Sequence, residues 1–115
     1  NTGEKTALVK QFAAFLADLH AKGIYFRSIH LNNVILTPEG GFGLIDISDL
    51  HYWGLPLTIS KRVRNFRPIF KCDQDRKIFE GVSIEFFLDC YVENAGFKSK
   101  RKGELMSRNV LNQYF

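Results

Sequence analysis

The sequence predicts a mainly α-helical protein with one small β-hairpin, which is an α+β fold. Two segments, residues 4–22 and 73–94, repeat apolar side chains with the period of a helix. Between them, the short apolar runs 34–36 and 42–47 are separated by a turn that contains proline and glycine, as in an antiparallel hairpin. The chain has 115 residues, of which 45% are hydrophobic and 24% charged, and this composition is typical of a globular protein. We therefore expect one domain over residues 1–115.

The first predicted helix covers residues 4–22. Its apolar side chains recur at the spacing of one buried helical face, at Leu8, Phe12, Phe15, Leu16 and Leu19. Gly23 follows as a C-terminal stop, because glycine readily adopts the left-handed conformation that ends many helices. His20 lies near this end, where we expect a structural role, either favouring the helix dipole or capping carbonyl groups.

The segment 24–33 has no regular apolar period and is expected to form an ordered loop that leads into the hairpin. Asn33 stands just before the first strand of the hairpin and Asp46 near the end of the second, so pairing of the strands should bring them together. Amide and carboxylate oxygens are hard ligands of the kind that Mg²⁺ prefers. The same two residue types also stabilise turns, so a purely structural role stays open.

The segment 49–64 lacks a clear period and is expected to be a structured loop. Its end overlaps the densest positive cluster of the chain, residues 61–67, which contains Lys61, Arg62, Arg64 and Arg67. Such a cluster could bind phosphates or an acidic lipid surface, and it could equally be a solvated face.

The second long helix is predicted over residues 73–94, with Gly81 as a point where it could kink or break and Gly96 as its stop. A basic link over 98–102 should lead to a short terminal helix over 104–115 that is frayed at its end.

The net charge of +4 is compatible with an anionic partner. Cys72 and Cys90 are far apart in the sequence, so they support neither a zinc site nor a disulfide framework. No apolar run is long enough to cross a bilayer, and we expect neither a membrane span nor a signal peptide in this sequence. Because the chain begins at Asn1 without a methionine, we expect a fragment of a longer protein.

The stretch from Leu19 to Leu50 resembles the catalytic core of the eukaryotic-like protein kinase superfamily. That family ends a helix in Leu-His, continues with the pattern His-Arg-Asp-Leu-x-x-x-Asn and an apolar strand, and then places a metal-binding Asp-Phe-Gly motif. The corresponding residues here are LHAKGI, then FRSIHLNN from Phe26 to Asn33, then VIL, and then Asp46-Ile47-Ser48. Within the superfamily, the amino-acid sequence of this stretch is most similar to bacterial lipopolysaccharide-core (Kdo/heptose) kinase relatives, including proteins labelled toluene tolerance.

The resemblance implies a protein-kinase-like C-terminal lobe, with a catalytic-loop and metal-site region at 19–50, an activation-like loop at 49–72 and a helical remainder at 73–115. It implies Mg²⁺ and ATP as cofactors of the full-length protein, and it implies that the fragment alone binds neither. The site residues that match the motif by position are Arg27, Ser28, Asn33 and Asp46.

By this resemblance, Asn33 and Asp46 would hold the metal and contact the cofactor, while Arg27 would hold the loop. Ser28 stands where the family has its catalytic aspartate, and serine cannot act as a base near pH 7. His30 and Asp49 are the nearest substitutes. The resemblance also implies that Arg64 and Arg67 lie near the site, and it gives Asp75 either a bracing or a helix-capping role. Phe26 stands where the family has the histidine of this loop.

The full-length parent would then transfer the γ-phosphate of ATP to a sugar hydroxyl of the lipopolysaccharide core, at the inner face of the inner membrane. Its expected partners are an N-terminal lobe, since the chain has no glycine-rich loop, and the lipopolysaccharide core or another anionic acceptor. Apolar surface left without that lobe predicts self-association. The alternative is a pseudokinase, a binding or scaffold module without phosphotransfer. A nucleic-acid-binding domain built on residues 61–67 is the least favoured hypothesis.

Overall fold

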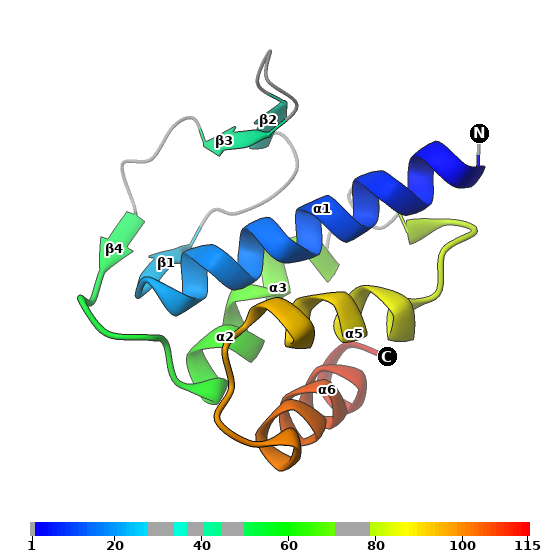
Figure 1. Ribbon diagram of the computed structural model, residues 1–115. Helices are drawn as coiled ribbons and strands as arrows, with labels where there is room; N and C mark the ends of the chain where they lie inside the picture. The colour runs from blue at the N-terminus through cyan, green and yellow to red at the C-terminus, as the bar shows by residue number, and fades with distance from the viewer. Residues whose placement is uncertain (1, 28–33, 37–40, 45–49, 71–78) are drawn as a thin grey trace.

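The computed structural model describes residues 2–27, 34–36, 41–44, 50–70 and 79–115 (Figure 1). Helices form most of this part of the chain, accompanied by two small antiparallel sheets, so the predicted α+β class is confirmed. The helices are α1 (Thr2–Ala21), α2 (Ile59–Asn65), α3 (Arg67–Phe70), α5 (Ile84–Asn94) and α6 (Lys100–Tyr114). The strands are β1 (Ile24–Phe26), β2 (Val34–Leu36), β3 (Phe42–Leu44) and β4 (Leu50–Tyr52).

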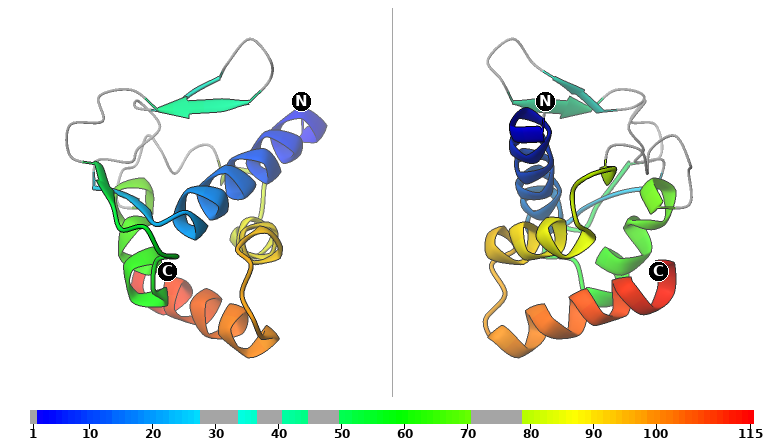
Figure 2. Two further views of the ribbon diagram at one scale, coloured as in Figure 1. Left: turned by 60° about the vertical axis from the view of Figure 1, so that its left-hand side comes forward. Right: turned by 90° about the vertical axis from the view of Figure 1, so that its right-hand side faces the viewer.

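Helix α1 confirms the helix predicted over residues 4–22 and ends where expected. Gly23 has a φ of 85°, the left-handed conformation that glycine adopts without a steric penalty. The buried face of α1 packs along α5, and Figure 2 shows the two helices side by side. Its buried hydrophobic side chains are Val9, Phe12, Ala13, Leu16 and Ala17.

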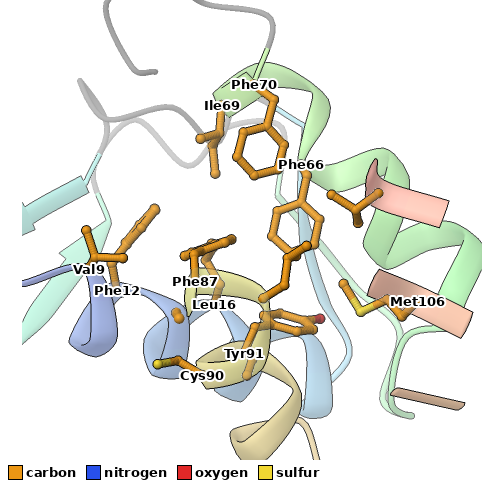
Figure 3. Packing of buried hydrophobic residues seen from close by; sticks show 14 of the residues in the cluster. Val9, Phe12, Leu16, Phe66, Ile69, Phe70, Phe87, Cys90, Tyr91 and Met106 are labelled. Atoms are coloured by element: carbon orange, nitrogen blue, oxygen red, sulfur yellow. The ribbon is translucent and has the colours of Figure 1, made fainter. Parts of the chain in front are cut away.

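The core cluster combines buried side chains of α1, α2, α3, α5 and α6 (Figure 3). Several aromatic rings lie within it, and Phe66, the C-cap residue of α2, contacts rings of α3 and α5. Phe66 lies 5.2 Å from Tyr91 and 5.8 Å from Phe87 between ring centroids, both in edge-to-face geometry. Phe70 adds a further edge-to-face contact to Phe87 at 6.0 Å. Pairs of this kind contribute about 0.5–1.5 kcal/mol each beyond the area they bury. The cluster therefore fixes α2 and α3 against the α1–α5 pair.

The predicted hairpin is present as β2 and β3, which pair antiparallel with Val34 opposite Leu44. It lies at the end of the molecule opposite α6 (Figures 1 and 2). The ring of Phe42 packs 5.8 Å from Phe12 and 5.5 Å from Phe15, so the hairpin is anchored on α1.

A second antiparallel pair, β1 with β4, was not predicted, because both strands fall in segments expected to be loops. Ile24 pairs with Tyr52 and Phe26 with Leu50. Strands of three residues are too short to show an alternating pattern, and the pairing joins segments far apart in the chain. This ladder joins the residues that directly precede the 27–49 segment to the residues that directly follow it.

The prediction of a loop over 49–64 was also wrong at its end, where α2 begins at Ile59. The Oγ1 of Thr58 accepts a hydrogen bond from the Lys61 N–H at 3.2 Å and caps the helix. Two basic residues, Arg62 and Arg64, lie in its last turn, where positive charge favours the helix dipole.

The single long helix predicted over 73–94 is interrupted in its described part. Gly81 has a φ of 83°, and α5 starts only at Ile84, after Ser83 caps it by accepting a hydrogen bond from the Phe86 N–H at 3.1 Å. The break anticipated at Gly81 is thus confirmed, and the stop at Gly96 is confirmed by its φ of 72°.

The terminal helix starts earlier than predicted, at Lys100, because Ser99 caps it by accepting a hydrogen bond from the Lys102 N–H. The basic segment expected to be a link is therefore largely the first turn of α6. That helix continues to Tyr114, whose hydroxyl donates to the Val63 carbonyl at 2.8 Å, so its end is held against α2.

Replacement of Gly23 by alanine is expected to lower the free energy of unfolding by about 2 kcal/mol. A Cβ at this position would collide with the carbonyl oxygen of Leu55, in addition to the strain of its positive φ. Gly54 is the matched control, because its φ is 75° and a Cβ there meets nothing within 4 Å. Gly54→Ala should therefore cost only about 1 kcal/mol in urea denaturation. Equal losses for the two variants would contradict the close approach at Gly23.

Candidate functional site

The pocket of interest lies beside the end of β1 and has a volume of about 510 Å³. Arg27, the residue directly after β1, lines it together with Arg64 and Arg67. Its complete lining among the described residues is Tyr25, Arg27, His51, Trp53, Lys61, Arg64, Arg67 and Pro68. Four of these side chains are cationic, and within this lining no carboxylate faces them. We call this cavity the basic pocket.

Helical periodicity explains how the charged cluster of α2 and α3 is divided. Lys61 and Arg64 are three residues apart on α2, so they share one face that reaches the pocket, and Arg67 lines the pocket from the start of α3. Arg62 lies on another side of the helix and is buried, with an exposed fraction of 2%. Three of the four cations of the cluster therefore line the pocket, whereas Arg62 does not.

Aromatic side chains complete the wall of the basic pocket. The Nζ of Lys61 lies 4.1 Å above the ring of Trp53, a cation–π arrangement. Trp53 itself is 55% exposed, so part of its ring remains accessible. The pocket thus combines groups that bind anions with an aromatic surface that can stack on a ligand.

The position of Arg27 depends on a buried chain of hydrogen bonds beneath it. Asn65 donates through Nδ2 to the carbonyl of Phe26, the residue before Arg27, at 2.8 Å. The Oδ1 of Asn65 lies 2.8 Å from Nε2 of His20, which must donate because Oδ1 can only accept. The end of α1 is thereby linked to β1 through a residue of α2.

The same chain continues from His20 to α5. Nδ1 of His20 lies 2.6 Å from the hydroxyl of Tyr91, and since Nε2 carries the proton of the neutral ring, Nδ1 accepts from that hydroxyl. Arg62 donates through Nη1 to the Tyr91 oxygen at 3.2 Å and through Nε to the Leu57 carbonyl at 2.9 Å. Each member of the chain therefore has a defined donor or acceptor role.

Burial sets the protonation of this network. It lowers the pKa of His20 to about 4, an effect opposed by the hydrogen bond to Asn65 and reinforced by the nearby charge of Arg62. Burial also raises the pKa of the Tyr91 hydroxyl, while Arg62 acts in the opposite direction. His20 is therefore a neutral structural residue at pH 7. Its role is structural, as expected, but its side chain binds Asn65 and Tyr91 in place of helix carbonyl groups.

Of the four site residues predicted from the sequence, Arg27 belongs to the described part of the chain. Ser28, Asn33 and Asp46 lie outside the described residues. The other positions singled out by the resemblance, His30, Asp49 and Asp75, also lie outside them. Arg64 and Arg67, which the resemblance places near the site, line the basic pocket together with Arg27.

The donor chemistry of the predicted metal ligands, an amide oxygen and a carboxylate, suits Mg²⁺. The described residues nearest to them in the chain, Val34 and Leu44, are paired across the hairpin. Within the described ranges, no group of three or more His, Cys, Asp or Glu side chains could hold a metal ion.

Comparisons with protein-family models, curated proteins and solved structures found no match to this chain. Among the helices of the described residues, none combines the length and the apolar character needed to cross a bilayer.

Proposed function

We propose that this chain is the C-terminal lobe of a kinase-like protein related to lipopolysaccharide-core sugar kinases. The full-length parent would transfer the γ-phosphate of ATP to a core sugar hydroxyl while lying at the inner face of the inner membrane. The observation that carries the proposal is the convergence of Arg27 with Arg64 and Arg67 in one pocket beside the kinase-like stretch. Guanidinium groups of this kind bind the phosphate or carboxylate groups of an anionic acceptor.

The strand pairs support the same proposal. The β1–β4 ladder brings Phe26 opposite Leu50, so the residues that flank the segment with the motif lie side by side. The β2–β3 hairpin pairs Val34, which follows Asn33, with Leu44, which stands two residues before Asp46. Strand pairs of this kind would hold the loop and the metal-binding motif close to each other.

In the proposed site, Asn33 and Asp46 would hold Mg²⁺, which when bound with ATP neutralises charge on the transferred phosphoryl group. Arg27 would hold the loop at the end of β1. Ser28 would line the acceptor position, where its hydroxyl can donate or accept a hydrogen bond but cannot remove a proton near pH 7. Arg64 and Arg67 would orient the anionic acceptor.

The test is a calorimetric titration of Mg·ATP into the parent protein with its N-terminal lobe. Asp46→Asn is expected to weaken binding at least tenfold, about 1.4 kcal/mol, because a charged metal ligand is lost. Asp89→Asn is the matched control, since Asp89 is exposed on α5, and it should bind as the unmodified protein does. Equal affinities for the unmodified protein and Asp46→Asn would remove the metal role.

A pseudokinase is the second candidate, and the serine at position 28 favours it. Such a protein would keep the fold as a binding or scaffold module without phosphotransfer. Transfer of phosphate from ATP to purified lipopolysaccharide core by the parent, and not by its Asp46→Asn variant, would exclude this candidate. Binding of Mg·ATP with no transfer to the core would support it.

A further inference from the structure

The segment from Tyr52 to Leu55 exposes three large apolar side chains within four residues. Tyr52 is 71% exposed, Trp53 55% and Leu55 73%. We call this segment the apolar tip. It consists of the last residue of β4 and the start of the connection to α2, at an outer edge of the molecule (Figure 1). Elsewhere in the described ranges, the exposed large apolar side chains are Leu105 and Phe115, which belong to the C-terminal region.

The tip is held in place by the backbone at both of its ends. The N–H of Trp53 donates to the carbonyl of Gly23 at 2.8 Å, and the N–H of Leu57 donates to the carbonyl of His20 at 2.9 Å. Gly54 turns the chain between them with a φ of 75°. Leu57 is buried, whereas Leu55 points outward, 73% exposed. The exposed side chains are thus presented by an anchored turn.

Positive charge lies directly beside the tip. Trp53 belongs to the tip and also to the wall of the basic pocket, where Lys61 stacks over its ring. Arg27, Arg64 and Arg67 line the same pocket. An apolar turn that contains tryptophan and tyrosine, with cations around its base, matches the interface of a bilayer with anionic headgroups.

We propose that the apolar tip inserts into the surface of an anionic bilayer while the cations of the basic pocket contact the headgroups. The proposal rests on the proposed function, because it supplies a docking surface for the peripheral location assumed there. We choose an anionic bilayer as the partner because its charge is complementary to the cations of the basic pocket. A second copy docked symmetrically would place the same patch against itself, and the four cations of each pocket would repel those of the other.

Trp53 is the only tryptophan of the chain, so its fluorescence reports on the tip alone. We expect its emission to shift to the blue, and the protein to sediment with the vesicles, when phosphatidylcholine vesicles contain an equal part of phosphatidylglycerol. Vesicles of phosphatidylcholine alone should bind at least tenfold more weakly. High salt should reduce binding to the anionic vesicles, since it screens the headgroup charge.

Matched variants separate the apolar and the charged contributions. The double variant Tyr52→Ser with Leu55→Ser keeps the fluorescent reporter and should weaken partitioning at least tenfold. Leu105→Ser, a control at an exposed apolar position of α6, should leave it unchanged. A double variant that replaces two cations of the pocket, Arg64→Gln with Arg67→Gln, should lose most of the preference for anionic vesicles. The control is a double variant on α6, Arg101→Gln with Arg108→Gln, which should keep that preference.

Several outcomes would overturn the proposal. These are no shift of Trp53 emission with anionic vesicles, equal losses in the tip variant and in Leu105→Ser, and tighter binding to a polyuridylate than to vesicles. Self-association that the tip variant abolishes, without any vesicle binding, would assign the tip to a second copy. Circular dichroism of each variant verifies its fold. Because the vesicle test needs neither nucleotide nor phosphotransfer, its failure is distinguishable from failure of Mg·ATP binding.

Discussion

Replacement of Asn65 by alanine is expected to lower the free energy of unfolding by about 3–5 kcal/mol. The amide of Asn65 accepts from Nε2 of His20 and donates to the carbonyl of Phe26. Alanine would leave both groups buried without a partner, at a cost of about 1–3 kcal/mol each. It would also leave a small cavity, because Asn65 is 2% exposed.

Urea denaturation at pH 7 measures this loss, and Asn94→Ala is its control. Asn94 donates through Nδ2 to the Cys90 carbonyl within its own helix, and it is an exposed residue. That replacement should cost less than about 1 kcal/mol, since water can satisfy the carbonyl. If the two variants lose the same stability, Asn65 does not join α1, α2 and β1 as its hydrogen bonds indicate.

Replacement of Asn65 should also change the position of side chains in the basic pocket. Asn65 holds the carbonyl of Phe26, and Arg27 follows directly in the chain. The ladder partner of Phe26 is Leu50, so the same contact supports the strand that leads to Trp53. The hydrogen-bonded network is therefore the structural basis of the candidate site as well as of the fold.

Features that depend on neighbours in the sequence could be predicted. The helix over 4–22 follows from apolar spacing, and its end follows from Gly23. The hairpin of Val34–Leu36 with Phe42–Leu44 follows from two apolar runs around a turn. The break at Gly81 was anticipated from the residue type alone.

Features that depend on distant partners could not be predicted in the same way. The pairing of β1 with β4 joins residues 24–26 to residues 50–52, and neither segment has a pattern that selects the other. The inward position of Arg62 likewise depends on the Leu57 carbonyl and the Tyr91 hydroxyl, which tertiary packing brings to it. A buried guanidinium is stable only where such acceptors are present.

One signal of the buried network was present in the sequence. Phe12, Leu16 and His20 are four residues apart, so His20 continues the apolar face of its helix. All three are buried, with exposed fractions of 1%. A histidine on a buried face needs polar partners, although the sequence does not show that they are Asn65 and Tyr91.

Stability should fall by about 3 kcal/mol as the pH decreases from 6.5 to 4, through His20. Burial lowers the pKa of His20 to about 4 in the folded protein, whereas an unfolded histidine has a pKa of about 6.5. Between these values the unfolded chain binds a proton that the folded protein excludes, so acid favours unfolding. The pKa values differ by about 2.5, and each pKa unit corresponds to about 1.4 kcal/mol.

About 2 kcal/mol of this loss is expected between pH 6.5 and 5, before most carboxylates titrate. Urea denaturation across this range should show it in the unmodified protein and in His51→Gln, whose altered residue is exposed on β4. His20→Gln should be less stable at pH 7 but nearly independent of pH over the same range, because glutamine does not titrate. A retained pH dependence in His20→Gln would assign the effect to other groups. Since protonated His20 would meet the Arg62 charge at the shared Tyr91 hydroxyl, acid should loosen the contact between α1 and α5 first.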